Sequence, residues 1–237
     1  MKFLSILAFL VISTVSAFAA DWSFIQDRLN DPVYSGPSGL EGNVVGDSIH
    51  IFGINTETPP GNNDPLRYWP GLSAESTTEF TGFTLEASAS LNGSGSGYMY
   101  GITIWGDRSH YIMYGLDFDA SVPYQPSKWT AYGGMPIPEI MPTWTILGGP
   151  INDPNGLHQV KVELAGGVAR FWFDEVLLDT TSFSMPNAKL RLGAFARANG
   201  DTVDASYSSI VFTPVPEPAT MAVFGLGLLA FIKRRRK

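Results

Sequence analysis

Apolar and polar residues alternate along much of the middle of the chain. From Phe83 to Leu91 every second residue is apolar and the residues between them are polar, and the same period of two returns in 160–164 and 190–196. Successive side chains of a strand point to opposite faces, so this period is typical of a strand with one buried face. The pattern therefore predicts β-sheet packed on a core.

Further short apolar runs are bounded by glycine-rich or charged turns. The segment 92–97 reads Asn-Gly-Ser-Gly-Ser-Gly and predicts a turn, and 165–167 predicts a tight hairpin. Strands are also expected at 98–105, 111–118, 168–173, 176–178 and 205–212, with weaker candidates at 42–54 and 143–147. About ten short strands without an amphipathic helix between them predict an all-β fold, an antiparallel two-sheet sandwich.

The second strand of the hairpin at 160–173 allows a finer prediction. Phe171 and Phe173 share one face of this strand, and Trp172 lies on the other. We expect the two phenylalanines to be buried in the core and the tryptophan to be at least partly exposed.

Three segments between residues 157 and 196 resemble the concanavalin A-like or laminin-G-like jelly roll. They are 157–164, 168–175 and 190–196. The superfamily often has such a hairpin with an aromatic-Asp-Gly turn, and this chain departs from it with Glu175 after Asp174. The resemblance implies a jelly-roll sandwich for residues 20–213. The alternative is an immunoglobulin-like sandwich, for which 20–213 is long.

The C-terminal residues 214–237 combine three features that a folded domain does not need. Pro216-Glu217-Pro218 lies in a proline-broken linker, 219–232 is uncharged, and 233–237 is Lys-Arg-Arg-Arg-Lys. The uncharged run satisfies its backbone as a helix in lipid, and the cations keep the end cytoplasmic. Its length of about 21 Å falls short of the hydrocarbon core of about 30 Å, so it predicts a marginal transmembrane segment.

This tail closely resembles the PEP-CTERM sorting signal of bacterial exported proteins. The resemblance rests on Pro216, Glu217 and Pro218, the apolar segment and the basic end, in that order. It implies that an exosortase-type membrane protease cuts near the motif and delivers the protein to the cell exterior. The alternative is a plain tail anchor.

The N-terminus indicates export as well. Lys2 precedes an apolar stretch, and Ala17 and Ala19 suit cleavage by signal peptidase after Ala19. We therefore expect a signal peptide at 1–19, one β-sandwich domain at 20–213 and a sorting signal at 214–237. The precursor would be anchored in the inner membrane of a bacterium, expected to be Gram-negative, before it reaches the cell surface or the medium.

Charge and cysteine content narrow the possible partners. Residues 20–213 hold nine of the 15 basic residues and 21 of the 22 acidic ones, so their formal net charge is −12. Such a surface repels phosphates, so we expect no nucleic-acid partner. The chain has no cysteine, which excludes disulfides and thiolate chemistry.

Catalytic and metal motifs are weak in this sequence. Laminarinase-like members of the resembled superfamily carry Glu-x-Asp-x-x-Glu on one strand, and no such string occurs here. Asp117 and Asp119 share a strand face and could bind calcium with Asp153 or Asn155. The alternative is a solvated strand end. Otherwise we expect no cofactor, since the three histidines lack metal-ligand spacing.

Aromatic residues are the remaining binding candidates. A proline-rich region at 120–150, expected to be a long loop, contains Tyr124, Trp129, Tyr132 and Trp144. Their rings could stack on sugars, or they could cap the end of the core.

The two functional hypotheses belong to different classes. The first is a noncatalytic exported or cell-surface protein that binds extracellular polysaccharide or contributes to a biofilm matrix. The second is a carbohydrate-active enzyme on the same jelly roll. The sequence favours the first, because the sorting signals are strong and catalytic motifs are missing.

Overall fold

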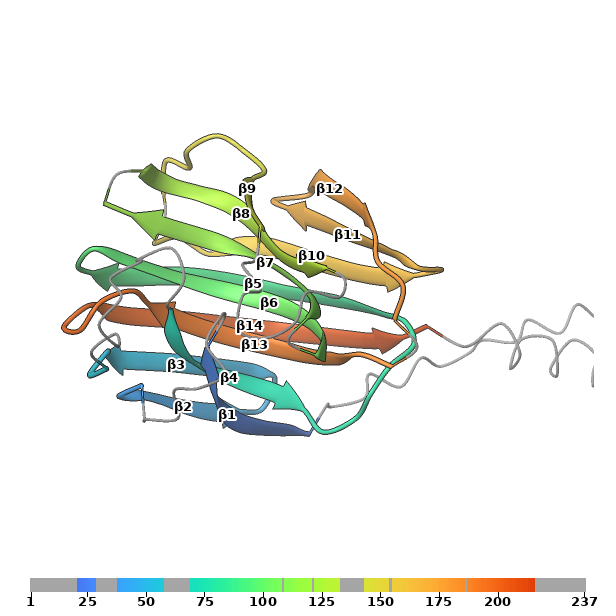
Figure 1. Ribbon diagram of the computed structural model, residues 1–237, viewed down its shortest axis with the longest axis horizontal. Coiled ribbons are helices and arrows are strands. Elements are labelled where there is room, and N and C mark those ends of the chain that lie inside the picture. Colours follow the sequence, from blue (N-terminus) through green and yellow to red (C-terminus); the bar gives the residue numbers. More distant parts are fainter. Residues whose placement is uncertain are drawn as a thin grey trace, which may run out of the picture.

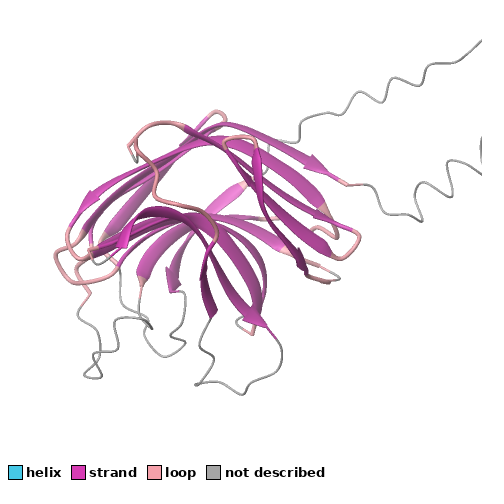
Figure 2. Cartoon of the chain, turned by 90° about the horizontal axis from the view of Figure 1, so that it is seen from above, coloured by secondary structure: helices cyan, strands magenta, loops and turns pink. Residues whose placement is uncertain are grey.

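Fourteen strands and no helix make up the part of the chain that the computed structural model describes. That part consists of residues 21–28, 38–57, 69–107, 109–120, 122–132, 143–153, 155–185 and 187–215. The strands form two antiparallel sheets of seven strands each, which lie face to face as two curved layers (Figure 1, Figure 2). The prediction of an all-β, two-sheet jelly-roll sandwich is confirmed, and the immunoglobulin-like alternative is not needed.

The first layer, sheet A, has the strand order β1-β4-β13-β6-β7-β8-β9. Its strands are, in that order, Trp22–Arg28, Pro70–Ser76, Lys189–Ala196, Gly97–Asp107, His110–Asp119, Val122–Tyr132 and Thr143–Ile146.

The second layer, sheet B, has the strand order β12-β11-β10-β5-β14-β3-β2. Its strands are, in that order, Val176–Ser182, Val168–Phe173, His158–Ala165, Phe83–Ser94, Thr202–Pro214, Ser48–Ile54 and Leu40–Val45.

The core lies between the inner faces of the two sheets. Burial alternates along β5 and β10 as the sequence pattern predicts. Phe171 and Phe173 are buried at 0% and 5% exposure, and Trp172 is half-buried on the other face, which confirms the finer prediction. The layers are also joined by Tyr207 of β14, whose hydroxyl donates to the carbonyl of Gly193 in sheet A at 2.7 Å.

The expectation of a long loop at 120–150 is wrong. Most of the described residues of this region belong to β8 and β9, which pair from Ser127 to Thr130 on β8. Pro126 precedes that paired segment, so its missing N–H falls where β8 has no partner in β9. The prolines of β8 therefore mark the part of this strand that is not paired with β9, and not a loop.

Other differences concern strands that the sequence pattern indicated weakly or not at all. The candidate at 42–54 is a hairpin, β2 and β3, that turns at Asp47 and at Gly46, whose φ of 62° suits glycine. β1 and β4 were not predicted. Every residue of β4 is buried, so β4 lacks the alternation that marks a half-buried strand.

The folded part ends where the C-terminal tail begins. The last described residue, Val215, donates its N–H to the carbonyl of Gly82 at 2.9 Å. No helix long and apolar enough to cross a membrane occurs among the described residues, and 216–237 lie outside them. The predicted signal peptide at 1–19, with Ala17 and Ala19, also lies outside the described residues.

Candidate functional site

The outer face of sheet A carries a second buried apolar cluster, separate from the core. It consists of Trp69, Met99, Met113, Trp129 and Phe195, with Trp144 packed against it. The ring centroid of Trp129 lies 6.1 Å from that of Trp69 and 6.2 Å from that of Trp144. We call these three residues the tryptophan cluster. Trp144 is its half-buried member, and the other two are buried.

Glycines form the floor beneath these side chains. Gly193, Gly101 and Gly115 are direct partners across β13, β6 and β7. A Cβ atom on Gly101 would lie 2.3 Å from Sδ of Met113, and one on Gly193 would lie 2.9 Å from the ring of Phe195. The absence of side chains at these positions is therefore what allows large groups to lie flat on the sheet.

Buried polar atoms without partners gather on the same face. Within the described ranges, the indole N–H groups of Trp69 and Trp129, Oδ1 of Asp117 and the hydroxyl of Ser127 make no hydrogen bond. Each such group costs about 1–3 kcal/mol of folding free energy. Two donors and two oxygen atoms in one patch match the chemistry of hydroxyl groups, which both donate and accept.

Asp117 has the most unusual electrostatic environment of this face. Burial raises its pKa to about 7, and the negative charge of Asp119 adds to the rise. The indole of Trp144, which lies near the carboxyl outside regular hydrogen-bond geometry, and the charge of Arg197 offset only part of it. Asp119 itself forms an ion pair with Arg197. The two neighbouring carboxyls therefore have different protonation behaviour.

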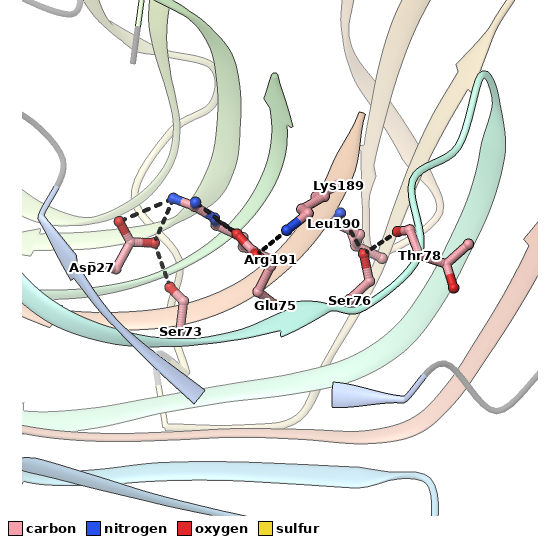
Figure 3. A network of polar contacts seen from close by, with 8 residues as sticks. All are labelled: Asp27, Ser73, Glu75, Ser76, Thr78, Lys189, Leu190 and Arg191. Carbon is pink, nitrogen blue, oxygen red and sulfur yellow. Dashed lines mark hydrogen bonds and ion pairs between the residues drawn. The ribbon is translucent and has the colours of Figure 1, made fainter. Parts of the chain in front are cut away.

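A network of charges lies on the same face, on β1, β4 and β13 (Figure 3). Arg191 is at its centre, with one guanidinium nitrogen 2.7 Å from Glu75 and another 3.4 Å from Asp27. Lys189 donates to Glu75 at 2.7 Å, and the hydroxyl of Ser73 donates to Asp27 at 2.7 Å. Ser73 of β4 and the cations of β13 thus hold both carboxylates and link the three strands.

This network is suited to stability rather than proton transfer. Burial alone would raise the pKa of Glu75, but the hydrogen bonds and charges of Lys189 and Arg191 outweigh it and lower the pKa. The Arg191 guanidinium lies 3.6 Å above the ring of Trp105, which stacks on Tyr111 with centroids 5.3 Å apart. Trp105 therefore supports a buried cation.

The structure brings together only some of the predicted site residues. Trp129 and Trp144 are neighbours, and Asp117 and Asp119 share their face of sheet A. Tyr124 faces the core instead, where its hydroxyl bonds to that of Tyr98. The side chain of Tyr132 lies outside the described part, as do Pro216, Glu217 and Pro218.

The proposed calcium ligands do not form a recognisable metal group. Among the described residues no three His, Cys, Asp or Glu side chains are placed to hold a metal ion. Asp119 is already paired with Arg197, and the raised pKa of Asp117 disfavours its ionised form. Asp153 uses its backbone carbonyl to accept a bond from His158 at 2.7 Å. The arrangement therefore fits a hard cation poorly, and calcium binding stays a prediction.

Sequence reasoning missed Trp69 and the charge network. Trp69 directly precedes β4, which has no alternation, and Glu75 and Arg191 are 116 positions apart. Only the strand order brings them together.

The fold is shared with several solved structures. A functionally unknown protein from Saccharomyces cerevisiae matches with a TM-score of 0.58 and 12% identity, over 83% of this chain and 97% of that one. LamAcat from Zobellia galactanivorans matches with a TM-score of 0.50 and 12% identity, over 80% and 90%. A GH16 protein from Bacteroides ovatus, in complex with a G4G4G3G product, matches with a TM-score of 0.50 and 11% identity, over 82% and 98%. At these identities the likeness establishes the jelly-roll sandwich and no activity.

The sequence of the C-terminal tail shows that it is a sorting signal. Residues 214–237 match the PEP-CTERM protein-sorting motif, which confirms the resemblance seen in Pro216-Glu217-Pro218. The chain is therefore an exported jelly-roll protein, with a membrane-anchored precursor that an exosortase-type system processes for the cell surface. A comparison with curated proteins finds no match.

Proposed function

We propose that this protein is a noncatalytic cell-surface or extracellular protein that binds polysaccharide on the outer face of sheet A. The observation that carries the proposal is the tryptophan cluster with its unpartnered polar atoms. Aromatic rings stack on the apolar faces of sugars, and Trp144 is the ring that is accessible for this. The indole N–H groups of Trp69 and Trp129, Asp117 and Ser127 are buried, so they would bond sugar hydroxyls only after the groups that cover them move aside. Trp144, half-buried at the rim, is the first ring that an approaching glycan would contact.

The test is a glycan-array screen of the full-length protein with and without calcium. Trp144→Ala should weaken polysaccharide binding and leave the melting temperature almost unchanged, because its ring is only partly packed. Phe52 is half-buried on β3, on the outer face of sheet B, and Phe52→Ala is the matched control that should bind normally. Absence of binding to any glycan in both conditions would refute the proposal. Loss of stability without loss of binding would make Trp144 a core residue.

A carbohydrate-active enzyme is the second candidate, favoured by one observation. Asp117, with a pKa of about 7, lies beside Asp119, which is paired with a cation. Glycoside hydrolysis needs one protonated carboxyl as the acid and one ionised carboxylate as the nucleophile, so two neighbouring carboxyls with different pKa values suit this chemistry. Reducing-sugar release from β-glucans, abolished in Asp117→Asn, would establish this candidate; no release from any glycan that the array identifies would exclude it.

We also propose the route by which the protein reaches the surface. Signal peptidase would cut after Ala19 in a Gram-negative host, and the exosortase-type protease near Pro216 to Pro218. Mass spectrometry of the extracellular protein should find an N-terminus at Ala20 and no residues 233–237. Retention of those five residues would indicate a permanent tail anchor.

A further inference from the structure

A row of outward side chains crosses sheet B from β12 to β14. Leu177, Trp172, Lys161, Glu86 and Val211 are successive direct partners on β12, β11, β10, β5 and β14. Leu177 and Val211 at its two ends are 49% and 47% exposed. The row thus places an aromatic ring and an ion pair between two exposed apolar residues, on the side of the sandwich opposite to the tryptophan cluster.

A cavity opens at the centre of this row. Its volume is about 340 Å³, and it is lined by Glu86, Gln159, Val160, Lys161, Trp172 and Glu175. Ligand pockets span about 300–1,000 Å³, so this one has room for one or two sugar rings and not for a long segment of polymer.

The polar groups of the cavity are held in place but accessible. Nζ of Lys161 lies 2.7 Å from Glu86 and 5.3 Å from the centroid of the Trp172 ring. The two charged side chains are 37% and 53% exposed. Gln159 donates its amide to the hydroxyl of Ser88 at 2.8 Å. Donors and acceptors therefore surround one aromatic ring.

The turn that carries Glu175 forms one wall of the cavity. Asp174 and Glu175 have φ values of 47° and 66°, a left-handed conformation that L-residues adopt at a cost. Asp174 compensates for its strain, because its carboxylate accepts from the backbone N–H of Gln159 at 2.9 Å and lies 2.8 Å from Nδ1 of His158.

Glu175 has no such compensation. Its side chain is exposed and forms no hydrogen bond or ion pair among the described residues, yet it lines the cavity. Glycine would suit the backbone better at this position. The two-residue turn between β11 and β12 requires positive φ at both positions, so this hairpin is what fixes Glu175 at the cavity wall.

We propose that this cavity, the Trp172 pocket, binds a single neutral sugar unit. Trp172 would stack on the sugar ring, and Gln159, Lys161, Glu86 and Glu175 would bond its hydroxyls. One cation and two carboxylates give the pocket a net negative charge, which disfavours uronates and phosphates. A cationic ligand is disfavoured because Lys161 already occupies the cation position at the ring.

The pocket does not depend on the function proposed for sheet A. If both sites bind, one domain holds two glycans on opposite faces, and only this bridging role rests on the proposed function. The protein would then crosslink a matrix as a monomer.

The experiment is saturation-transfer NMR on the full-length protein in a zwitterionic detergent without sugar groups. The probes are the methyl glycosides of glucose, galactose and mannose, with glucuronate as the charged comparison. At least one neutral glycoside should bind, and Trp172→Ala should weaken its binding about tenfold or more. Phe52→Ala removes an aromatic ring elsewhere on the same face and should bind normally.

Glu175→Gly separates a ligand site from a merely structural turn. It should weaken sugar binding and raise the melting temperature by about 2 °C, because the backbone strain is relieved. The pocket proposal is overturned if no neutral glycoside binds, if glucuronate binds equally well, or if Trp172→Ala binds like the unmodified protein. Trp144→Ala should not change sugar binding in the Trp172 pocket. Failure of the proposal for sheet A on the glycan array can therefore be told apart from failure of the pocket proposal in this experiment.

Discussion

Asp117 should make the stability of the protein fall as the pH rises toward neutrality. Its carboxyl is 4% exposed on the outer face of sheet A, and burial raises its pKa to about 7, against an ordinary value of 3.8. Between these two values the unfolded chain has released this proton and the folded chain has kept it. The free energy of unfolding therefore falls with rising pH in this window.

The magnitude follows from the width of the window. One proton difference corresponds to about 1.4 kcal/mol per pH unit, so the total loss between pH 4 and pH 7 is about 4 kcal/mol. That is a large part of the stability of a typical domain, which is about 5–15 kcal/mol. Asp117→Asn replaces the neutral acid by a neutral group of the same shape, so the variant should be more stable than the unmodified protein at pH 8.

The assay is urea unfolding at half-unit steps from pH 4.5 to pH 8. The unmodified protein should lose stability across this range, and Asp117→Asn should lose less by about 1 kcal/mol per unit. Asp119→Asn is the control: it removes the charge that adds to the raised pKa of Asp117, so stability should still fall with rising pH, but over a narrower window. Loss of the ion pair with Arg197 should lower stability independently of Asp117. Parallel curves for the unmodified protein and Asp117→Asn would refute the reasoning, because they would show that Asp117 titrates normally in the fold.

Three other substitutions test how the sandwich is held together. Phe171→Ala should cost about 3–5 kcal/mol of stability in chemical unfolding, since the ring is fully buried, and an unchanged midpoint would contradict the packing described here. Arg191→Met should cost a similar amount at pH 7 and less at pH 4, because it leaves Asp27 buried without a cation and Glu75 with Lys189 alone; equal losses at both pH values would argue against the network. Asp201→Ala should lower the melting temperature by roughly 10 °C, because this carboxylate accepts four hydrogen bonds, three from Ser96 and Gly97 and one from the backbone of Ala198. A shift within 2 °C, or about 0.5–1 kcal/mol, would show that water replaces these hydrogen bonds.

The sequence predicted most strands from their apolar runs and their alternation, and it missed β1 and β4. β5 and β10 alternate because one face meets the core and the other meets solvent, so their pattern was readable. The expected turn at 92–97 is shorter than predicted, because β5 continues to Ser94 and β6 begins at Gly97. β4 is buried on both faces, and its residues Pro-Gly-Leu-Ser-Ala-Glu-Ser carry no period. β8 contains two prolines, and only its place beside a short edge strand shows why a strand tolerates them.

The candidate site depended on information that the sequence does not contain. Trp129 and Trp144 were identified from composition, but Tyr124 was assigned to the same set although it faces the core. Which residues meet across a sheet depends on strand order, and β4, β13 and β6 are neighbours although long segments separate them in the chain. The meeting of Glu75 with Arg191 could therefore not be read from spacing.

The position of the sorting motif has a mechanical consequence. The strand that leads into it, β14, lies between β5 and β3 and ends at Pro214, the first residue of the matched motif. A pull on the tail, whether during extraction from the membrane or during transfer to the surface, acts along β14 and loads its hydrogen bonds to both neighbours in shear. Such bonds yield together rather than one at a time, as they would at a peeling edge strand, so the rate of forced unfolding stays low. The membrane machinery can thus pull on the tail, or cleave it, without unfolding the β-sandwich domain to which it is attached.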